Sequence, residues 1–157
     1  MLCTRIGTPC VLLLALLLSA SRAVGAEDTV IADPVVAKLH DKVVRFLESV
    51  STETNTAFNE LLLGSPLSEQ KDSVRSLVDK SKEIADRYGV FRESEQVSAK
   101  RIGKDVVLLK YLYKCEKFPV LWYFAFYRDF TRSTVAGDDY WLVISVRFDT
   151  QIEALGY

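Results

Sequence analysis

The sequence is poor in the residues that support several common kinds of site. It holds one histidine, His40, and three cysteines in 157 residues, and Cys3 and Cys10 lie in the first ten residues, where cleavage of a signal peptide would remove them. His40 and Cys115 alone are too few ligands for a Cys/His metal centre. Four prolines and seven glycines exclude the low-complexity classes. Neither sign of charge prevails, with 20 basic and 21 acidic residues, so electrostatic capture of nucleic acid is not expected. The remaining composition, 49% hydrophobic and 26% charged, is that of an ordinary globular domain.

Residues 1–26 have the layout of a secretory signal peptide. Arg5 supplies the basic start, VLLLALLLSA is a short apolar run, and Val24 and Ala26 precede a cleavage site. The run is much shorter than the ~20 residues that a membrane-spanning helix needs, although a retained anchor is the alternative interpretation. We predict an exported protein, periplasmic or secreted, that begins near Glu27 and has no membrane span after cleavage.

Cleavage would leave a mature chain with a single thiol. Cys3 and Cys10 would be removed with Arg5 and Arg22, and the net charge would become 18 minus 21, or -3. The lone Cys115 cannot build a disulfide framework. Residues 27–157 are therefore expected to form one domain that an apolar core stabilises.

Two amphipathic helices are predicted in the first half of this domain. Asp33-Pro34 is typical of an N-cap and first helical position, and Gly64 is typical of a helix end. The pattern predicts a long helix between them, with a kink or frayed turn at residues 51–56. A second helix is predicted from about Leu67 to Tyr88. The apolar stripe of the first helix comprises Val36, Leu39, Val43, Phe46, Leu47, Val50, Ala57, Phe58 and Leu61.

After Gly89 the apolar period changes from 3.6 to 2, which predicts strands. Residues 91–102 suit a charged edge strand, and VVLLKYLYKCE, VLWYFAFYRDF and YWLVISVRFD suit three more. A turn at 103–105, a hairpin loop at 116–119 and a loop at 131–139 separate them. The predicted fold class is α+β, with two N-terminal helices packed on a curved antiparallel sheet of about four strands.

Alternation assigns the strand residues to two faces. Trp122, Phe124 and Phe126 are predicted to lie under the helices, as are Leu142, Ile144, Val146 and Phe148 in the last strand. The opposite face would be open, because two helices cover only one side of such a sheet. Its predicted members are Val106, Leu108, Lys110, Leu112, Lys114, Leu121, Tyr123, Ala125, Tyr127, Trp141, Val143, Ser145 and Arg147.

The central hairpin and last strand resemble those of small exported bacterial proteins of unknown function with cystatin-like or NTF2-like folds. Their pattern is Y-L-x-K-x-E-x-F-P-x-x-W-x-F-x-F-Y, with a final strand that ends in F-D. The resemblance covers most of the mature chain and implies the fold, but no activity. The positions here that match are Tyr111, Leu112, Lys114, Glu116, Phe118, Pro119, Trp122, Phe124, Phe126, Tyr127, Phe148 and Asp149.

NTF2-like folds include enzymes, so an acid or base in a pocket has to be considered. The candidate parts are His40, Tyr111, Tyr113 and Asp149. Structural roles are the more common explanation of each of them, and no second partner for His40 can be identified in the sequence. Cys115 has no adjacent base and is interpreted as a small core residue. No phosphate loop, Ser-His-Asp spacing or carboxylate cluster occurs, so no cofactor is expected.

A binding role for the open face is the favoured interpretation. Aromatic residues mixed with Arg and Lys are what interfaces favour, and Tyr123, Tyr127, Trp141 and Arg147 are the predicted binding residues. We expect an exported, non-catalytic module that uses this face for a homodimer or for a small apolar ligand. The alternative is a small NTF2-like isomerase or hydrolase that acts on an apolar molecule. A protease inhibitor of the cystatin type is a third class, but an exposed glycine-bearing wedge is missing.

Overall fold

The computed structural model describes residues 33–132 and 140–151. It has the expected α+β fold, in which three α-helices pack with a four-stranded antiparallel sheet. The predicted signal peptide and most of the 131–139 loop lie outside the described residues. The elements in chain order are α1 (Pro34–Ser49), α2 (Thr54–Leu61), the 3₁₀ turn η2 (Pro66–Glu69), α3 (Lys71–Tyr88), β1 (Phe91–Ile102), β2 (Val106–Cys115), β3 (Pro119–Arg128) and β4 (Trp141–Asp149).

The predicted long first helix is in fact two helices, α1 and α2. α1 ends at Ser49, where the Ser49 hydroxyl donates to the Arg45 carbonyl at 2.8 Å. Thr54 then donates its hydroxyl to the Val50 carbonyl at 2.8 Å as α2 begins. Thr54 thus binds the Val50 carbonyl through its side chain at the start of α2, and the Ser49 bond is of the i to i−4 kind that bends helices. The predicted kink is a full break of the helix.

The second predicted helix begins later than expected. Ser65 accepts a hydrogen bond from the Leu67 amide at 3.1 Å and starts the short 3₁₀ turn η2, and α3 follows from Lys71. Gly89, with φ 89°, ends α3 in a backbone conformation that few other residues adopt. Two helices were predicted and three are present because the chain turns twice between residues 50 and 70.

The strands form a meander in the order β1-β2-β3-β4. β2 and β3 pair without irregularity, from Val106 opposite Tyr127 to Lys114 opposite Pro119. β1 has two irregularities in its pairing with β2, between Phe91 and Glu93 and between Gln96 and Ser98. β1 and β4 are the edge strands, as the charged sequence of β1 predicts.

A bulge in β4 overturns part of the predicted face assignment. Ala125 lies opposite Ser145, but the next residue, Phe126, lies opposite Val143, so Ile144 is an extra residue. An extra residue reverses the alternation of faces, so the side chains before it and after it no longer follow one period of two. Trp141 and Val143 therefore belong to the helix-side core, and Leu142 lies outside it. Ile144, predicted to be buried, is 40% exposed.

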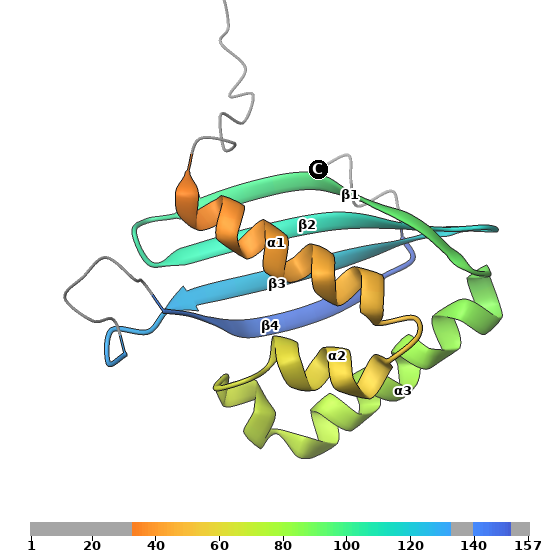
Figure 1. The fold of residues 1–157 in the computed structure, drawn as a ribbon, viewed down its shortest axis with the longest axis horizontal. Helices are drawn as coiled ribbons and strands as arrows, with labels where there is room; N and C mark the ends of the chain where they lie inside the picture. Colours follow the sequence, from red (N-terminus) through yellow and green to blue (C-terminus); the bar gives the residue numbers. More distant parts are fainter. Residues whose placement is uncertain (1–32, 133–139, 152–157) are drawn as a thin grey trace, which may run out of the picture.

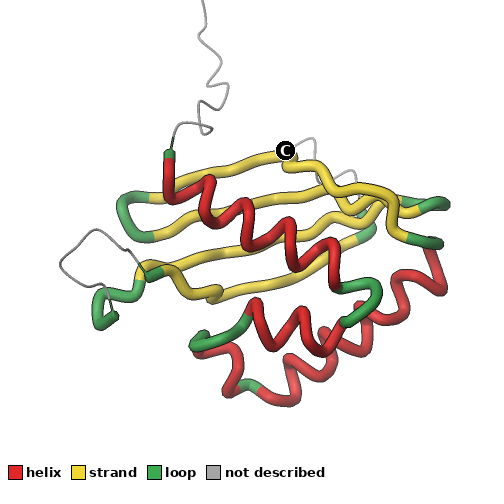
Figure 2. Tube along the Cα trace, in the orientation of Figure 1, coloured by secondary structure: helices red, strands yellow, loops and turns green. Residues whose placement is uncertain are grey.

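The core lies between the helices and one face of the sheet. Trp122, Phe124 and Phe126 are buried there, as predicted, and Phe46 of α1 meets the first two edge-on. Figure 1 shows α1 crossing this face diagonally, with α2 and α3 beside β4. Figure 2, in the same orientation, shows α1 on the near side of the sheet. The opposite face of the sheet has no helix among the described residues.

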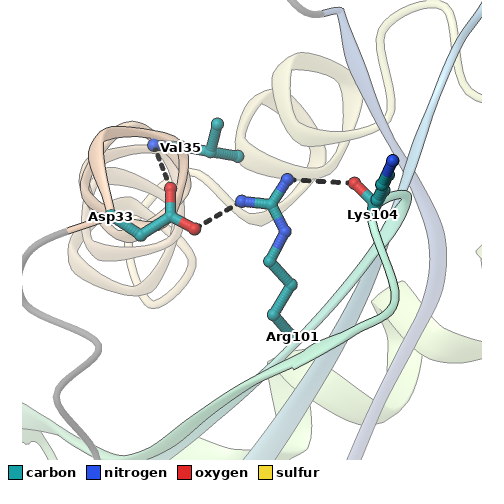
Figure 3. A network of polar contacts seen from close by, with 4 residues as sticks. All are labelled: Asp33, Val35, Arg101 and Lys104. Atoms are coloured by element: carbon teal, nitrogen blue, oxygen red, sulfur yellow. Dashed lines mark hydrogen bonds and ion pairs between the residues drawn. The ribbon is translucent and has the colours of Figure 1, made fainter.

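An ion pair ties the start of α1 to the sheet (Figure 3). Asp33 caps α1 by accepting from the Val35 amide at 2.9 Å, and its other oxygen pairs with Arg101 of β1. Arg101 also donates to the Lys104 carbonyl at 3.0 Å, in the β1–β2 turn. Burial opposes ionisation of Asp33, but the Arg101 hydrogen bond, the amides of Val35 and Val36 and the charge of Arg101 together outweigh it and lower the pKa of the carboxyl. The cap thus fixes α1 over the helix-side face of the sheet.

Candidate functional site

The candidate site is the sheet face that points away from the helices, called here the open face. The pairing register arranges its side chains in rows across the strands. The middle row is Ser98, Lys110, Tyr123 and Arg147; one neighbouring row is Lys100, Leu108, Ala125 and Ser145, and the row beyond that is Ile102, Val106, Tyr127 and Leu142. On the other side of the middle row lie Glu95, Leu112, Leu121 and Asp149.

Tyr123 stands at the centre of the middle row between two cations. Its direct neighbours across the strands are Lys110 of β2 and Arg147 of β4. Lys110 Nζ lies 5.4 Å, and Arg147 Cζ 4.4 Å, from the centroid of the Tyr123 ring. Such cation–π contacts each contribute about 0.5–1 kcal/mol at exposed positions. The ring therefore holds both positive groups in place on the open face.

A hollow of about 460 Å³ opens beside Tyr123. Small residues, Ala125, Ser98 and Ser145, leave space in it, while Leu108 adds apolar surface. Three cations, Lys100, Lys110 and Arg147, also line the hollow, and no carboxylate does. This volume is within the range of small-molecule sites.

The three cations of the hollow differ from the others on the sheet. The strands carry seven Lys or Arg, and four of them pair with carboxylates: Arg92, Arg101, Lys114 and Arg128. The remaining three, 7 minus 4, are Lys100, Lys110 and Arg147, which have no ion pair within residues 33–132 and 140–151. An unpaired cluster of like charge repels itself and attracts an anion. Positive charge is therefore left over at the hollow.

Of the four predicted binding residues, three lie on the open face. Tyr123 and Arg147 border the hollow, and Tyr127, 41% exposed, lies two rows from them. Trp141 does not belong to this face: it is 8% exposed, packs with the helix-side core and lies under Arg101. The β4 bulge is the physical reason, because it reverses the direction of Trp141 relative to Arg147.

Lys100 and Ser98 are the site residues that sequence reasoning missed. Both come from β1, whose faces could not be assigned by alternation because of its irregular pairing around Val97. Lys110 was predicted to lie on the correct face but is not one of the four predicted binding residues. Its position opposite Tyr123, with Arg147 on the other side of that ring, is shown only by the register.

The residues considered for catalysis are partly brought together. His40 Nδ1 lies 2.8 Å from Tyr111 Oη and 2.8 Å from Gln96 Oε1, so the partner that the sequence did not reveal exists. Burial raises the pKa of the fully buried Tyr111 phenol, which keeps it neutral. Tyr113 instead stacks on Phe91, with ring centroids 4.4 Å apart. Asp149 is exposed and accepts from the amides of residues 150 and 151.

A second, larger hollow of about 640 Å³ lies between α3 and the β4 edge. Apolar side chains, among them Leu67, Leu77 and Val146, form much of its wall, with Asp72 and Lys80 at its border. Its described lining has one acidic and one basic residue, whereas three cations line the open-face hollow. We therefore regard the open face as the better candidate for a site with chemical selectivity.

Metal and membrane sites receive no support from the described chain. Within residues 33–132 and 140–151, His, Cys, Asp and Glu side chains form no group of three that could hold a metal ion. None of the helices described is both long and apolar enough to cross a membrane.

In comparisons with known proteins, no family model matches this chain, and neither the curated proteins nor the solved structures give a significant match.

Proposed function

We propose that the protein is an exported, non-catalytic binding module that holds a ligand on its open face. The observation that carries this proposal is the convergence on one hollow of three cations that form no ion pair with the described residues. The proposal includes the cystatin-like or NTF2-like fold, which a helix lying across an antiparallel meander supports. It also includes cleavage near Glu27, because the first 26 residues have the composition of a signal peptide.

A homodimer is the other use of the open face that the sequence suggests. Tyr127 and Ile102 are 41% and 48% exposed there and give apolar surface for a second copy. However, a two-fold contact centred on Tyr123 would bring Lys110 and Arg147 of both copies together. Like charges brought together in this way cost free energy. We therefore favour a ligand over a second copy.

An enzyme is the alternative function, and the contact between His40 and Tyr111 is the observation in its favour. A catalytic pair has to reach a substrate, and the Tyr111 side chain is fully buried. Neither of the two hollows described above is lined by His40 or Tyr111. The pair is better explained as a polar link between α1, β1 and β2.

Chemical-shift mapping of the secreted protein with the anionic aromatic probe 8-anilinonaphthalene-1-sulfonate tests the proposal. We expect saturable amide shifts at Leu108, Tyr123 and Ala125, on a protein that mass spectrometry shows to begin near Glu27. Shifts confined to the neighbourhood of His40 and Tyr111 would favour the enzyme instead. Light scattering on wild type and Tyr123→Lys identifies the dimer: a wild-type dimer that Tyr123→Lys dissociates would assign the face to a second copy.

A further inference from the structure

We infer that the ligand of the open face is a free amphipathic anion, with a phosphate or carboxylate head on a single apolar tail. This inference rests on the proposed function and specifies its ligand. The head would lie between Lys100, Lys110 and Arg147, and the tail would lie along the strands. Three separate features of the open face support this assignment.

The first feature is the charge of the hollow. Lys100, Lys110 and Arg147 all line it without an ion pair from the described residues, and none of its lining residues is acidic. The planar guanidinium of Arg147 can donate two parallel hydrogen bonds to a carboxylate or phosphate, and each lysine adds a point charge. A neutral or cationic head would leave this charge uncompensated.

The second feature is the direction in which polarity changes across the rows. On one side of the middle row lies the row that contains Leu108 and Ala125. The row beyond it holds no charged residue and consists of Ile102, Val106, Tyr127 and Leu142. Two rows along a strand span about 13 Å, since each residue advances about 3.4 Å. In the opposite direction the next row contains Asp149, whose carboxylate would repel an anion, and Glu95, which pairs with Lys114. A ligand with an anionic end and an apolar end thus has one favourable orientation.

The third feature favours a free molecule over an anionic membrane surface. Besides the acidic row, Glu93 also lies on the open face, where it pairs with Lys114. The mature chain would carry a net charge of 18 minus 21, or -3. A flat anionic bilayer would meet these carboxylates together with the cations, whereas a single molecule in the hollow meets only the cations.

Calorimetric titration of the secreted protein with decyl phosphate and decanoate, each below its micelle concentration, tests the inference. Decyl maltoside has a matched tail with a neutral head, and inorganic phosphate is the head alone. We expect at least one of the two anionic amphiphiles to bind at one site per chain, and both control compounds to bind at least tenfold more weakly. Lys110→Gln and Arg147→Gln should each weaken binding of the amphiphile about tenfold or more, the effect expected for a lost charge-assisted bond.

Lys114→Gln is the matched control variant, because it removes the same charge from the same strand and face but from a lysine already paired with Glu93 and Glu95. It should change the affinity less than twofold. Circular dichroism of each variant establishes that it is folded before it is titrated.

The possible failures are distinguishable. Equal binding of decyl maltoside, or of inorganic phosphate alone, would overturn the amphipathic anion and leave a binding module on the open face. Cosedimentation with phosphatidylglycerol vesicles, without binding of the free amphiphiles, would also overturn it in favour of a membrane surface. A dimer that binds no amphiphile would overturn the ligand and assign the open face to a second copy of the chain. Binding that none of the open-face variants affects would overturn both this inference and the proposed function.

Discussion

The Tyr111 hydroxyl lies 2.8 Å from Nδ1 of His40 and links the middle of the sheet to α1. Gln96 of β1 completes the cluster, because its Oε1 accepts from the Tyr111 hydroxyl at 3.1 Å and lies 2.8 Å from the same nitrogen. Three elements separated in the sequence thus share one partly buried polar contact. In such a cluster each group satisfies another that burial has removed from water.

Tyr111→Phe should destabilise the protein by about 1 kcal/mol, because it removes the hydroxyl that both His40 and Gln96 contact and leaves these two side chains only their contact with each other. Urea unfolding measures the change as a shift in the midpoint at constant slope. Tyr123→Phe is the matched control: its hydroxyl has no hydrogen bond among the described residues, so a change within about 0.5 kcal/mol is expected. Equal effects of the two substitutions would contradict a structural role for the cluster.

Stability should fall in alkaline solution because of two buried tyrosines. Burial raises the pKa of Tyr113 to about 12 and also raises that of Tyr111. The unfolded chain releases these protons near pH 10, whereas the folded chain keeps them to higher pH. Above pH 10 the unfolded state therefore binds fewer protons, and the free energy of unfolding decreases with pH.

Urea unfolding at pH 9, 10 and 11 checks this dependence. Tyr113→Phe removes one of the two groups and should make the decline between pH 10 and pH 11 shallower. Tyr127→Phe, an exposed tyrosine on the open face, should leave the decline as in wild type. An alkaline decline that Tyr113→Phe does not alter would show that other groups cause it.

The strands and the helix-side face were predictable because alternation is a local property of the sequence. Trp122, Phe124 and Phe126 lie in a strand with regular pairing, so a period of two assigns them correctly. Trp141 was misassigned because the bulge at Ile144 depends on how β4 meets β3, which a single strand does not encode. The hollow was not predictable for the same reason. Lys100, Lys110 and Arg147 come from three strands, and only the register brings them together.

Trp122→Ala should be among the most damaging single substitutions in the core. The side chain is fully buried and lies against Phe46 and Phe148, with ring centroids 5.4 and 4.8 Å away. Loss of a large buried aromatic costs about 3–5 kcal/mol. Trp122→Phe should cost much less, because it keeps an aromatic ring and removes an indole N–H that has no hydrogen-bond partner among the described residues. A change below about 1 kcal/mol for Trp122→Ala would mean that the two faces of β3 are assigned the wrong way round.

Trp141→Ala tests the bulge directly. If the bulge turns Trp141 into the core, its loss should approach the range of about 3–5 kcal/mol for large aromatics. Tyr127→Ala, on the open face and 41% exposed, should cost clearly less. The original alternation predicts the same direction for both side chains, and therefore similar losses. Chemical denaturation of the two variants side by side distinguishes the two arrangements.

Cys115 should behave as a structural thiol. It is half-buried at the end of β2, opposite Phe91, and burial raises the pKa of its thiol. The thiolate is the reactive form, so Ellman's reagent at pH 7 should react slowly with the folded protein and quickly after unfolding in urea. Rapid reaction in the folded state would contradict this and favour a nucleophilic role.

The total number of thiols after unfolding tests the cleavage site: one thiol per chain is expected if residues 1–26 are removed, and three if Cys3 and Cys10 are retained. A count of three on protein from an exporting host would therefore contradict cleavage near Glu27, independently of how fast Cys115 reacts.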